Sequence, residues 1–131
     1  MRISQGDIYW VPLGNTAGAE TGPVHPHVII QDDLLNRSRL ESVVVCALTT
    51  NVKRAKAPGN VLLETGEANL PKQSVVVVSQ VSTVGKAQLG EYIGSLSQQR
   101  INQILADMRF LQRLSERPAT GQQRDSTAST D

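Results

Sequence analysis

The sequence predicts a mainly β protein in which short strands form a small, strongly bent β-barrel or half-barrel with one helix laid over it. Three observations predict this fold class: short runs rich in valine and isoleucine, long polar loops between them, and one C-terminal segment with helical spacing of its apolar residues. At 131 residues, the chain is long enough for one modest core and too short for two. We therefore expect a single domain.

The strand-like runs differ in how they are bounded and buried. The first follows Gly6 and ends at Pro12, which cannot donate a hydrogen bond to a neighbouring strand. The third is apolar throughout, which favours burial of both of its faces. Strands are expected at residues 7–12, 27–31, 42–48, 60–64 and 73–81, with a last short one at 92–94 and a single helical turn at 86–89. Loops are expected at residues 13–23, 34–40, 49–59 and 66–71.

The C-terminal part of the chain contains the one long helix that the sequence predicts. Ser95 or Ser97 can cap it, and Gln98 follows Ser95 by three residues, as in a capping box. The helix should end before Pro118. Its apolar face is formed by residues at three- and four-residue spacing: Ile101, Ile104, Leu105, Met108, Leu111 and Leu114.

The last part of the chain has a different composition. Residues 115–131 contain almost no large apolar side chain, so they cannot bury enough surface to offset the entropy of ordering. We therefore expect a single domain at residues 1–114, followed by a polar, mobile tail at residues 115–131.

Composition and charge restrict the possible partners. The formal net charge of +1 gives no overall attraction to nucleic acid or to an anionic membrane, so either partner would need a local patch. A single cysteine, Cys46, excludes an internal disulfide and is typical of a reducing cytosol. No apolar run is long enough to span a bilayer, and the first residues lack the apolar stretch of a signal peptide. We therefore expect a soluble cytoplasmic protein with no membrane partner.

Two histidines at the start of the second strand are candidates for chemistry. His25 and His27 are two residues apart and so project from the same face of a strand. Cleavage of RNA needs a base for the 2′-hydroxyl, an acid for the leaving 5′-oxygen, and donors for the charge on phosphorus. An imidazole titrates in the range that suits the base or the acid. Two other interpretations stay open: both histidines are partly buried structural residues, or they bind zinc together with Cys46.

Hydroxyl and cationic side chains gather after the third strand. Thr49 and Thr50 end it, and a hydroxyl at a strand end can donate to a phosphate oxygen. The basic residues Lys53, Arg54 and Lys56 follow at once and can neutralise a phosphate backbone despite the small net charge. These groups and the histidines belong to strand ends, so they could converge on one mouth of a barrel. The alternative is an ordinary turn with solvated surface charge.

Four motifs, in their order and spacing, resemble the MazF/PemK (Kid) toxins of bacterial type II toxin–antitoxin systems. The resemblance extends from about residue 5 to about residue 112. The motifs are Gly6-Asp7-Ile8-Tyr9-Trp10; Gly18-x-Glu20-x-Gly22 leading into Pro26-x-Val28-Ile29-Ile30-Gln31-Asp32-Asp33; Ala47-Leu48-Thr49; and Ser74-Val75-x-x-x-x-Gln80-Val81.

The resemblance implies a fold, an activity and partners. The fold is an SH3-like barrel with a C-terminal helix, shared by MazF, PemK and CcdB toxins and assembled as a homodimer. The activity is that of an mRNA interferase, a sequence-selective endoribonuclease that cleaves single-stranded RNA by attack of the 2′-hydroxyl, without a metal or cofactor. The products carry a 2′,3′-cyclic phosphate and a 5′-hydroxyl. The second partner is a cognate, MazE-like antitoxin, a segment of which blocks the RNA groove at the dimer interface.

One position departs from the family pattern. Relatives usually carry an arginine directly before the proline of the second strand, where this chain has His25, whereas the family's threonine at the end of the third strand is matched by Thr49. Histidine suits proton transfer better than arginine does, and suits phosphate clamping less. We predict His25 and Thr49 as the catalytic residues. RNA contacts are expected from polar residues of loops and strand ends: Glu20, His27, Asn36, Arg37, Lys53, Arg54, Lys56 and Gln80.

Two other functions are compatible with the same scaffold. If the histidine has abolished cleavage, the chain is a module that binds RNA or an antitoxin. A CcdB-like poison of gyrase would instead depend on its last helix and C-terminal residues, and the polar tail that follows the helix here argues against it.

Overall fold

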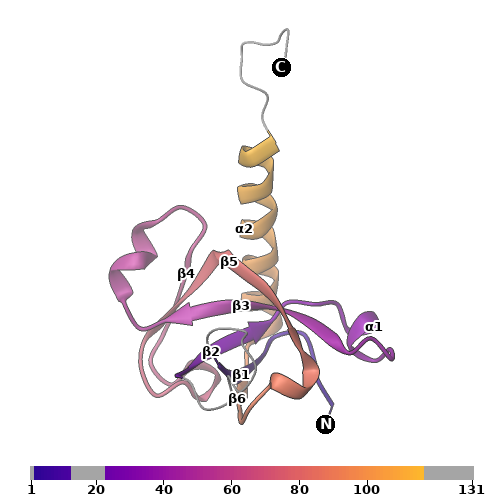
Figure 1. The fold of residues 1–131 in the computed structure, drawn as a ribbon. Coiled ribbons are helices and arrows are strands. Elements are labelled where there is room, and N and C mark those ends of the chain that lie inside the picture. The colour runs from indigo at the N-terminus through magenta and orange to yellow at the C-terminus, as the bar shows by residue number, and fades with distance from the viewer. Residues whose placement is uncertain (1, 13–22, 117–131) are drawn as a thin grey trace, which may run out of the picture.

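The computed structural model describes residues 2–12 and 23–116, except for the side chains of residues 114–116. One antiparallel sheet curls into a half-barrel, and a long helix, α2, stands over it (Figure 1). The strands are β1 (Asp7–Pro12), β2 (Val24–Ile29), β3 (Ser42–Thr49), β4 (Val61–Leu63), β5 (Ser74–Gly85) and β6 (Tyr92–Ser95). The helices are α1 (Asp33–Asn36), α2 (Gln98–Glu116) and the 3-10 turns η2 (Val52–Lys56), η3 (Glu67–Asn69) and η4 (Lys86–Gln88).

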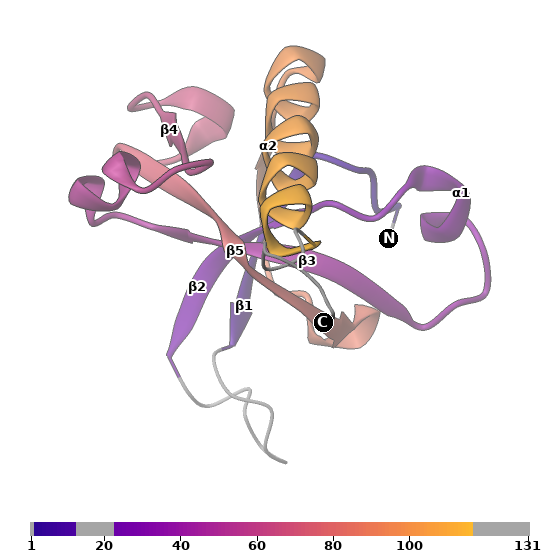
Figure 2. The same ribbon diagram turned by 90° about the horizontal axis from the view of Figure 1, so that it is seen from above.

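The sheet is organised around β3. Its strands lie in the order β4-β5-β3-β2-β1-β6, so β3 pairs with β2 on one side and with β5 on the other. In the first pair His27 lies opposite Ala47, and in the second Thr49 lies opposite Val75. The loops and turns around β4 and η2 lie at one end of this sheet and α1 lies at the other, as both views show (Figure 1 and Figure 2).

The core has two parts, one on each face of the sheet. Side chains alternate along a strand, so Cys46 of β3 packs with the cluster under α2 while Val45 packs with the cluster on the opposite face. The predicted burial of both faces of the third strand is therefore confirmed. The helix contributes its predicted stripe, with Ile101, Ile104 and Met108 buried. Burying each such side chain contributes roughly 1.5–3 kcal/mol.

The mainly β fold with one long C-terminal helix is confirmed, and the differences from the predicted elements have local causes. β2 begins at Val24 rather than at residue 27, and β5 continues to Gly85, because long-range pairing with β1 and β3 extends them. The predicted loops 34–40, 49–59 and 66–71 contain or overlap α1, η2 and η3. The side chains of Asp32 and Asn51 accept backbone N–H groups at the start of α1 and η2, which favours these helical turns.

The C-terminal helix continues beyond the predicted domain boundary. α2 reaches Glu116, so residues 115 and 116 are helical, and the rest of the expected tail lies outside the described residues. Within the part of the chain that the structure describes, no helix is both long and apolar enough to cross a membrane.

Gly94 in β6 is a point of close approach. A Cβ atom at this position would overlap the carbonyl oxygen of Ala68 in η3. We expect Gly94→Ala to lower the free energy of unfolding by about 1–3 kcal/mol, the range for overpacking. Gly85→Ala is the matched control, since its nearest neighbouring atom would be 3.5 Å away, and it should change stability by less than about 0.5 kcal/mol. Urea unfolding followed by tryptophan fluorescence checks both, and equal stability of the two variants would contradict the close approach.

His27 links folding stability to pH. Its ring is buried, which lowers the pKa of the imidazole; the hydrogen bond with the carbonyl of His25 only partly opposes this. Because the unfolded chain then binds the proton more tightly than the folded chain, stability is lost as pH falls through the ordinary histidine value of about 6.5.

We therefore expect His27→Asn, which can still donate to that carbonyl, to lose less stability than the wild type between pH 7.5 and pH 5.5. Thermal unfolding of both proteins across this range measures the difference. Parallel curves of melting temperature against pH would show that His27 is not responsible.

Candidate functional site

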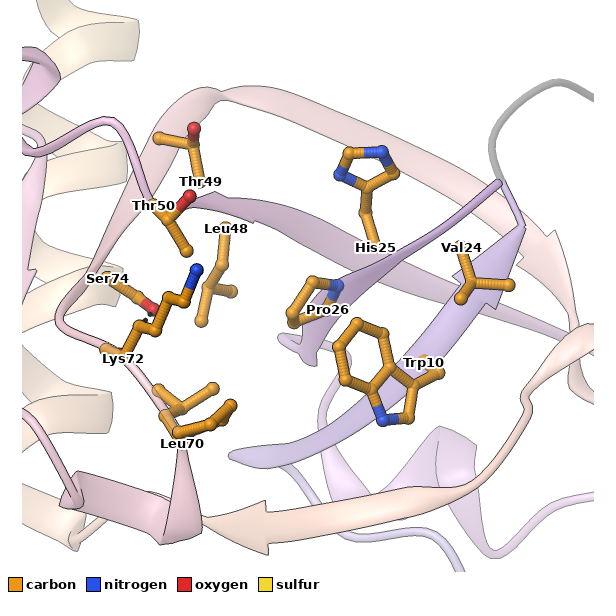
Figure 3. Close-up of a pocket in the computed structure, with 11 residues that line it drawn as sticks. Trp10, Val24, His25, Pro26, Leu48, Thr49, Thr50, Leu70, Lys72 and Ser74 are labelled. Carbon is orange, nitrogen blue, oxygen red and sulfur yellow. Dashed lines mark hydrogen bonds between the residues drawn. The ribbon is translucent and has the colours of Figure 1, made fainter. Parts of the chain in front are cut away.

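A cavity of about 280 Å³ opens between β2, the end of β3 and the segment that links η3 to β5 (Figure 3). Together with Trp10 of β1, four segments of the chain therefore form one site. The cavity is lined by Trp10, Val24, His25, Pro26, Leu48, Thr49, Thr50, Leu70, Pro71, Lys72 and Ser74.

Strand pairing brings the two predicted catalytic residues to this cavity. The pairing of β2 with β3 ends at His27 opposite Ala47, and His25 and Thr49 each lie two residues beyond this last pair, at the same end of the two strands. His25 is exposed and Thr49 is half-buried. Figure 3 shows both side chains along the same rim of the cavity. An imidazole and a hydroxyl are thus available to one ligand.

Thr49 is held in place by the turn that follows it. Its hydroxyl oxygen accepts a hydrogen bond of 3.2 Å from the backbone N–H of Asn51. A hydroxyl has one hydrogen to donate and two lone pairs, so this contact fixes the side chain and still allows Thr49 to donate to a phosphate oxygen.

The inner wall of the cavity is apolar. Leu48 and Leu70 are 3% and 2% exposed, and the indole of Trp10 lies on the side opposite the His25–Thr49 rim (Figure 3). Trp10 is positioned by β1, where it pairs with Pro26 of β2. A flat aromatic surface next to polar groups is suited to a nucleobase attached to a phosphate.

Lys72 is a site residue that the sequence analysis missed. It is exposed, and its ammonium points into the cavity (Figure 3). Its backbone carbonyl accepts a hydrogen bond of 3.0 Å from the hydroxyl of Ser74. The pairing of Thr49 with Val75 places the start of β5 next to Thr49 on the cavity rim. A correct prediction that the third and fifth strands pair antiparallel would have placed Lys72, which precedes the fifth strand, near Thr49.

The predicted basic residues lie next to the cavity and do not line it. Lys53, Arg54 and Lys56 belong to η2, which begins two residues after Thr50, and the two lysines are exposed. The side-chain amide of Asn60 donates to the carbonyl of Arg54 over 2.9 Å and so ties η2 to the sheet. The positive charge of this segment therefore extends from the cavity rim.

His27 has a different environment from His25. It is 6% exposed and does not line the cavity. Its Nδ1 lies 3.0 Å from the carbonyl oxygen of His25, and because a carbonyl only accepts, this nitrogen carries the proton. The structure therefore separates the two histidines: the first is available to a ligand and the second is structural.

Three other predicted RNA contacts are not brought to this cavity, and a fourth cannot be placed. Asn36 and Arg37 lie at the α1 end of the sheet, where Asn36 is buried and hydrogen-bonded to Gln31 and Arg37 donates to the carbonyl of Ile3. Gln80 is exposed on β5 and is not a lining residue. Glu20 lies outside the described residues.

Cys46 is unsuited to the zinc interpretation. Its thiol lies in the core under α2 and donates to the carbonyl of Val77. Burial raises the pKa of this thiol to about 12, which favours the neutral form over the thiolate that binds metal. Its neighbour Ala47, opposite His27, projects from the other face of the sheet. The described residues contain no cluster of three or more metal-ligating side chains.

Comparison with known proteins gives relatives for this fold and site. The chain is 38% identical over 96 residues to the endoribonuclease MazF2 of Mycobacterium bovis, covering 73% of this chain and 84% of the relative. The endoribonuclease MazF6 of Mycobacterium tuberculosis matches with the same identity and coverage.

Solved structures share the fold. A mycobacterial endoribonuclease in complex with its cognate antitoxin superposes with a TM-score of 0.69 at 25% identity, covering 86% of this chain and 96% of that one. MazF of Deinococcus radiodurans superposes with a TM-score of 0.67 at 18% identity, covering 86% and 98%. The model of the PemK-like, MazF-like toxins of type II toxin–antitoxin systems matches residues 4–111. This chain belongs to the PemK-like, MazF-like toxin family.

Proposed function

We propose that this protein is the toxin of a type II toxin–antitoxin pair and acts as a metal-independent endoribonuclease on single-stranded RNA. The observation that carries the proposal is the placement of His25 and Thr49 on one rim of a cavity that also holds Lys72 and an aromatic wall. Relatives named as endoribonucleases support it.

The proposed reaction needs two proton transfers. The 2′-oxygen forms a bond to phosphorus, the bond from phosphorus to the 5′-oxygen breaks, and the products are a 2′,3′-cyclic phosphate and a 5′-hydroxyl. One proton leaves the 2′-hydroxyl and another is added to the 5′-oxygen. The exposed imidazole of His25 can accept the first or donate the second, and we assign it one of these roles.

Charge on the phosphate is stabilised by other residues. The hydroxyl of Thr49 and the ammonium of Lys72 face the same cavity and can donate to the oxygens of the pentacoordinate phosphorus. Lysine acts as a point charge, so Lys72 can supply charge but not the bidentate geometry of a guanidinium. Lys53, Arg54 and Lys56 extend the positive surface along the RNA backbone.

The apolar wall supports binding of a base. Sequence-specific recognition of single-stranded RNA commonly stacks unpaired bases on aromatic side chains. A cavity of about 280 Å³ is at the small end of ligand sites, which suits part of a single nucleotide. We propose that Trp10 contacts the base next to the scissile phosphate.

The same surface suits an antitoxin. An extended acidic segment would complement η2 and Lys72 and would exclude RNA from the cavity. We propose that a MazE-like antitoxin inhibits the toxin in this way, and that both act in the cytoplasm, where the RNA substrate is present.

An open sheet edge favours a homodimer. Within the described residues β4 pairs only with residues 74–76 of β5, and the N–H of Val78 is satisfied by the side chain of Asn60 at 3.1 Å. Residues 79–83 are exposed and contain neither charge nor proline, the features that usually block an open edge. We propose that a second copy binds along this edge about a two-fold axis, so that identical residues meet.

Substitution of His25 tests the reaction. We expect His25→Ala to reduce cleavage of mixed-sequence RNA by about 10²–10⁴-fold, the usual contribution of a general acid or base. His25→Arg, which restores the family residue, should keep more activity than His25→Ala. Sequencing of the RNA ends measures the rate and identifies the terminal groups.

Each other outcome of this experiment has a clear meaning. Unchanged cleavage by His25→Ala would remove His25 from the mechanism. RNA binding by the wild type without products would identify a binding module, and toxicity in cells without RNA cleavage would favour a gyrase poison.

Substitution at the β5 edge tests the dimer. Val81 is 45% exposed, and we expect Val81→Lys to convert a dimer into a monomer because it places two like charges together at the two-fold axis. Val24→Lys is the matched control, since Val24 on β2 is also 45% exposed. Light scattering after size exclusion measures the mass. A dimer that persists in Val81→Lys would place the interface elsewhere.

A further inference from the structure

The wall of the cavity that carries Lys72 belongs to a turn, not to a strand. The segment of residues 66–72 lies within the connection from β4 to β5 and contributes Leu70, Pro71 and Lys72 to the lining. Leu70 is buried and anchors the middle of the wall, whereas Lys72 is exposed. The position of the ammonium therefore depends on how firmly this turn is held.

The turn has an unfavourable backbone conformation. Ala68 and Asn69 have φ angles of 51° and 65°, in the left-handed region, which asparagine tolerates but which is unfavourable for alanine. Such conformations persist where the surrounding structure imposes them. Without its external contacts, we expect this turn to relax and to move Lys72.

Two external contacts come from β6. The side-chain amide of Asn69 donates to the carbonyl of Ile93 over 3.3 Å, and the backbone of Ala68 packs against Gly94. These contacts hold the middle of the turn.

The third external contact comes from the first turns of α2. Arg100 donates from Nε to Oε2 of Glu67 over 2.8 Å and from Nη2 to Oε1 over 3.1 Å. The same Oε1 accepts the backbone N–H of Glu64 at 3.0 Å. Arg100 is itself fixed, because its Nη1 donates to Gln103 over 3.0 Å. A rigid helix is thus joined to the start of the turn by a two-pronged ion pair.

The ion pair is partly protected from solvent, since the side chains of Arg100 and Glu67 are 25% and 22% exposed. Partial burial alone would raise the pKa of the Glu67 carboxyl, but the hydrogen bonds from Arg100 and Glu64 outweigh it and hold the pKa below its usual value. The carboxylate therefore stays charged and bonded to Arg100 near neutral pH.

We propose that the Glu67–Arg100 pair is a positioning device that holds the turn of residues 66–72 so that Lys72 faces the scissile phosphate. This proposal rests on the function proposed above. Neither Glu67 nor Arg100 lines the cavity, so both act through the turn and not on the substrate. The helix α2 thereby influences RNA binding at the far side of the β4–β5 connection.

A double-mutant cycle tests the proposal. The variants are Arg100→Gln, Lys72→Ala and the double variant, and the probe is a fluorescein-labelled, fully 2′-O-methylated RNA of mixed sequence, which cannot be cleaved. We expect Arg100→Gln to weaken binding about fivefold in the wild-type background and to have no further effect in the Lys72→Ala background, because the two residues act as one unit. Arg109→Gln makes the same charge change at an exposed position of α2 and should leave binding unchanged.

Equal weakening by Arg100→Gln in both backgrounds, or no weakening in either, would overturn the proposal. A second measurement does not depend on RNA. Hydrogen–deuterium exchange of the backbone amides of residues 66–70 and 72 should be faster in Arg100→Gln than in Arg109→Gln. Unchanged exchange there would overturn the positioning role even if the wild type binds no RNA. Failure of the wild type to bind or cleave RNA would contradict the proposed function alone.

Discussion

The antiparallel pairing of β2 with β3 is the constraint on which the site depends. Because side chains alternate along a strand, a slip of one residue would turn His25 to the other face of the sheet and separate it from Thr49. The core prevents this slip: Val28 and Cys46 are paired and buried under α2. The geometry of the His25–Thr49 rim is therefore set by burial of apolar side chains, and not by bonds between the site residues themselves.

The two sides of the cavity have different physical origins. The His25–Thr49 rim belongs to the middle of the sheet and shares its stability, whereas the Lys72 wall is a turn with left-handed residues. Segments with few buried contacts open more easily than a core strand does. Individual contacts with β6 and α2 hold this turn, and they include the ion pair of Glu67 with Arg100. Local contacts thus have more influence on this wall than on the rim.

Sequence patterns predicted what depends on local periodicity. The helix stripe and the doubly buried third strand follow from spacing alone. Spacing did not predict the extensions of β2 and β5, because pairing with distant strands produces them. Spacing correctly placed His25 and His27 on one face, but it could not show that His27 is buried while His25 is exposed. Lys72 was missed for the same reason, since only the long-range pairing of β5 with β3 places it near Thr49.

In the proposed mechanism, histidine in place of the family's arginine divides proton transfer and charge stabilisation between two segments of the chain. A guanidinium carries a permanent charge, whereas an imidazole moves protons and is charged only part of the time. A site built on His25 therefore needs a separate cation at the phosphate. Lys72 is the one lysine or arginine among the described lining residues, and it comes from the opposite wall. In this mechanism the sheet positions the group that transfers the proton, while the cation that stabilises charge belongs to a turn that is bonded to Arg100.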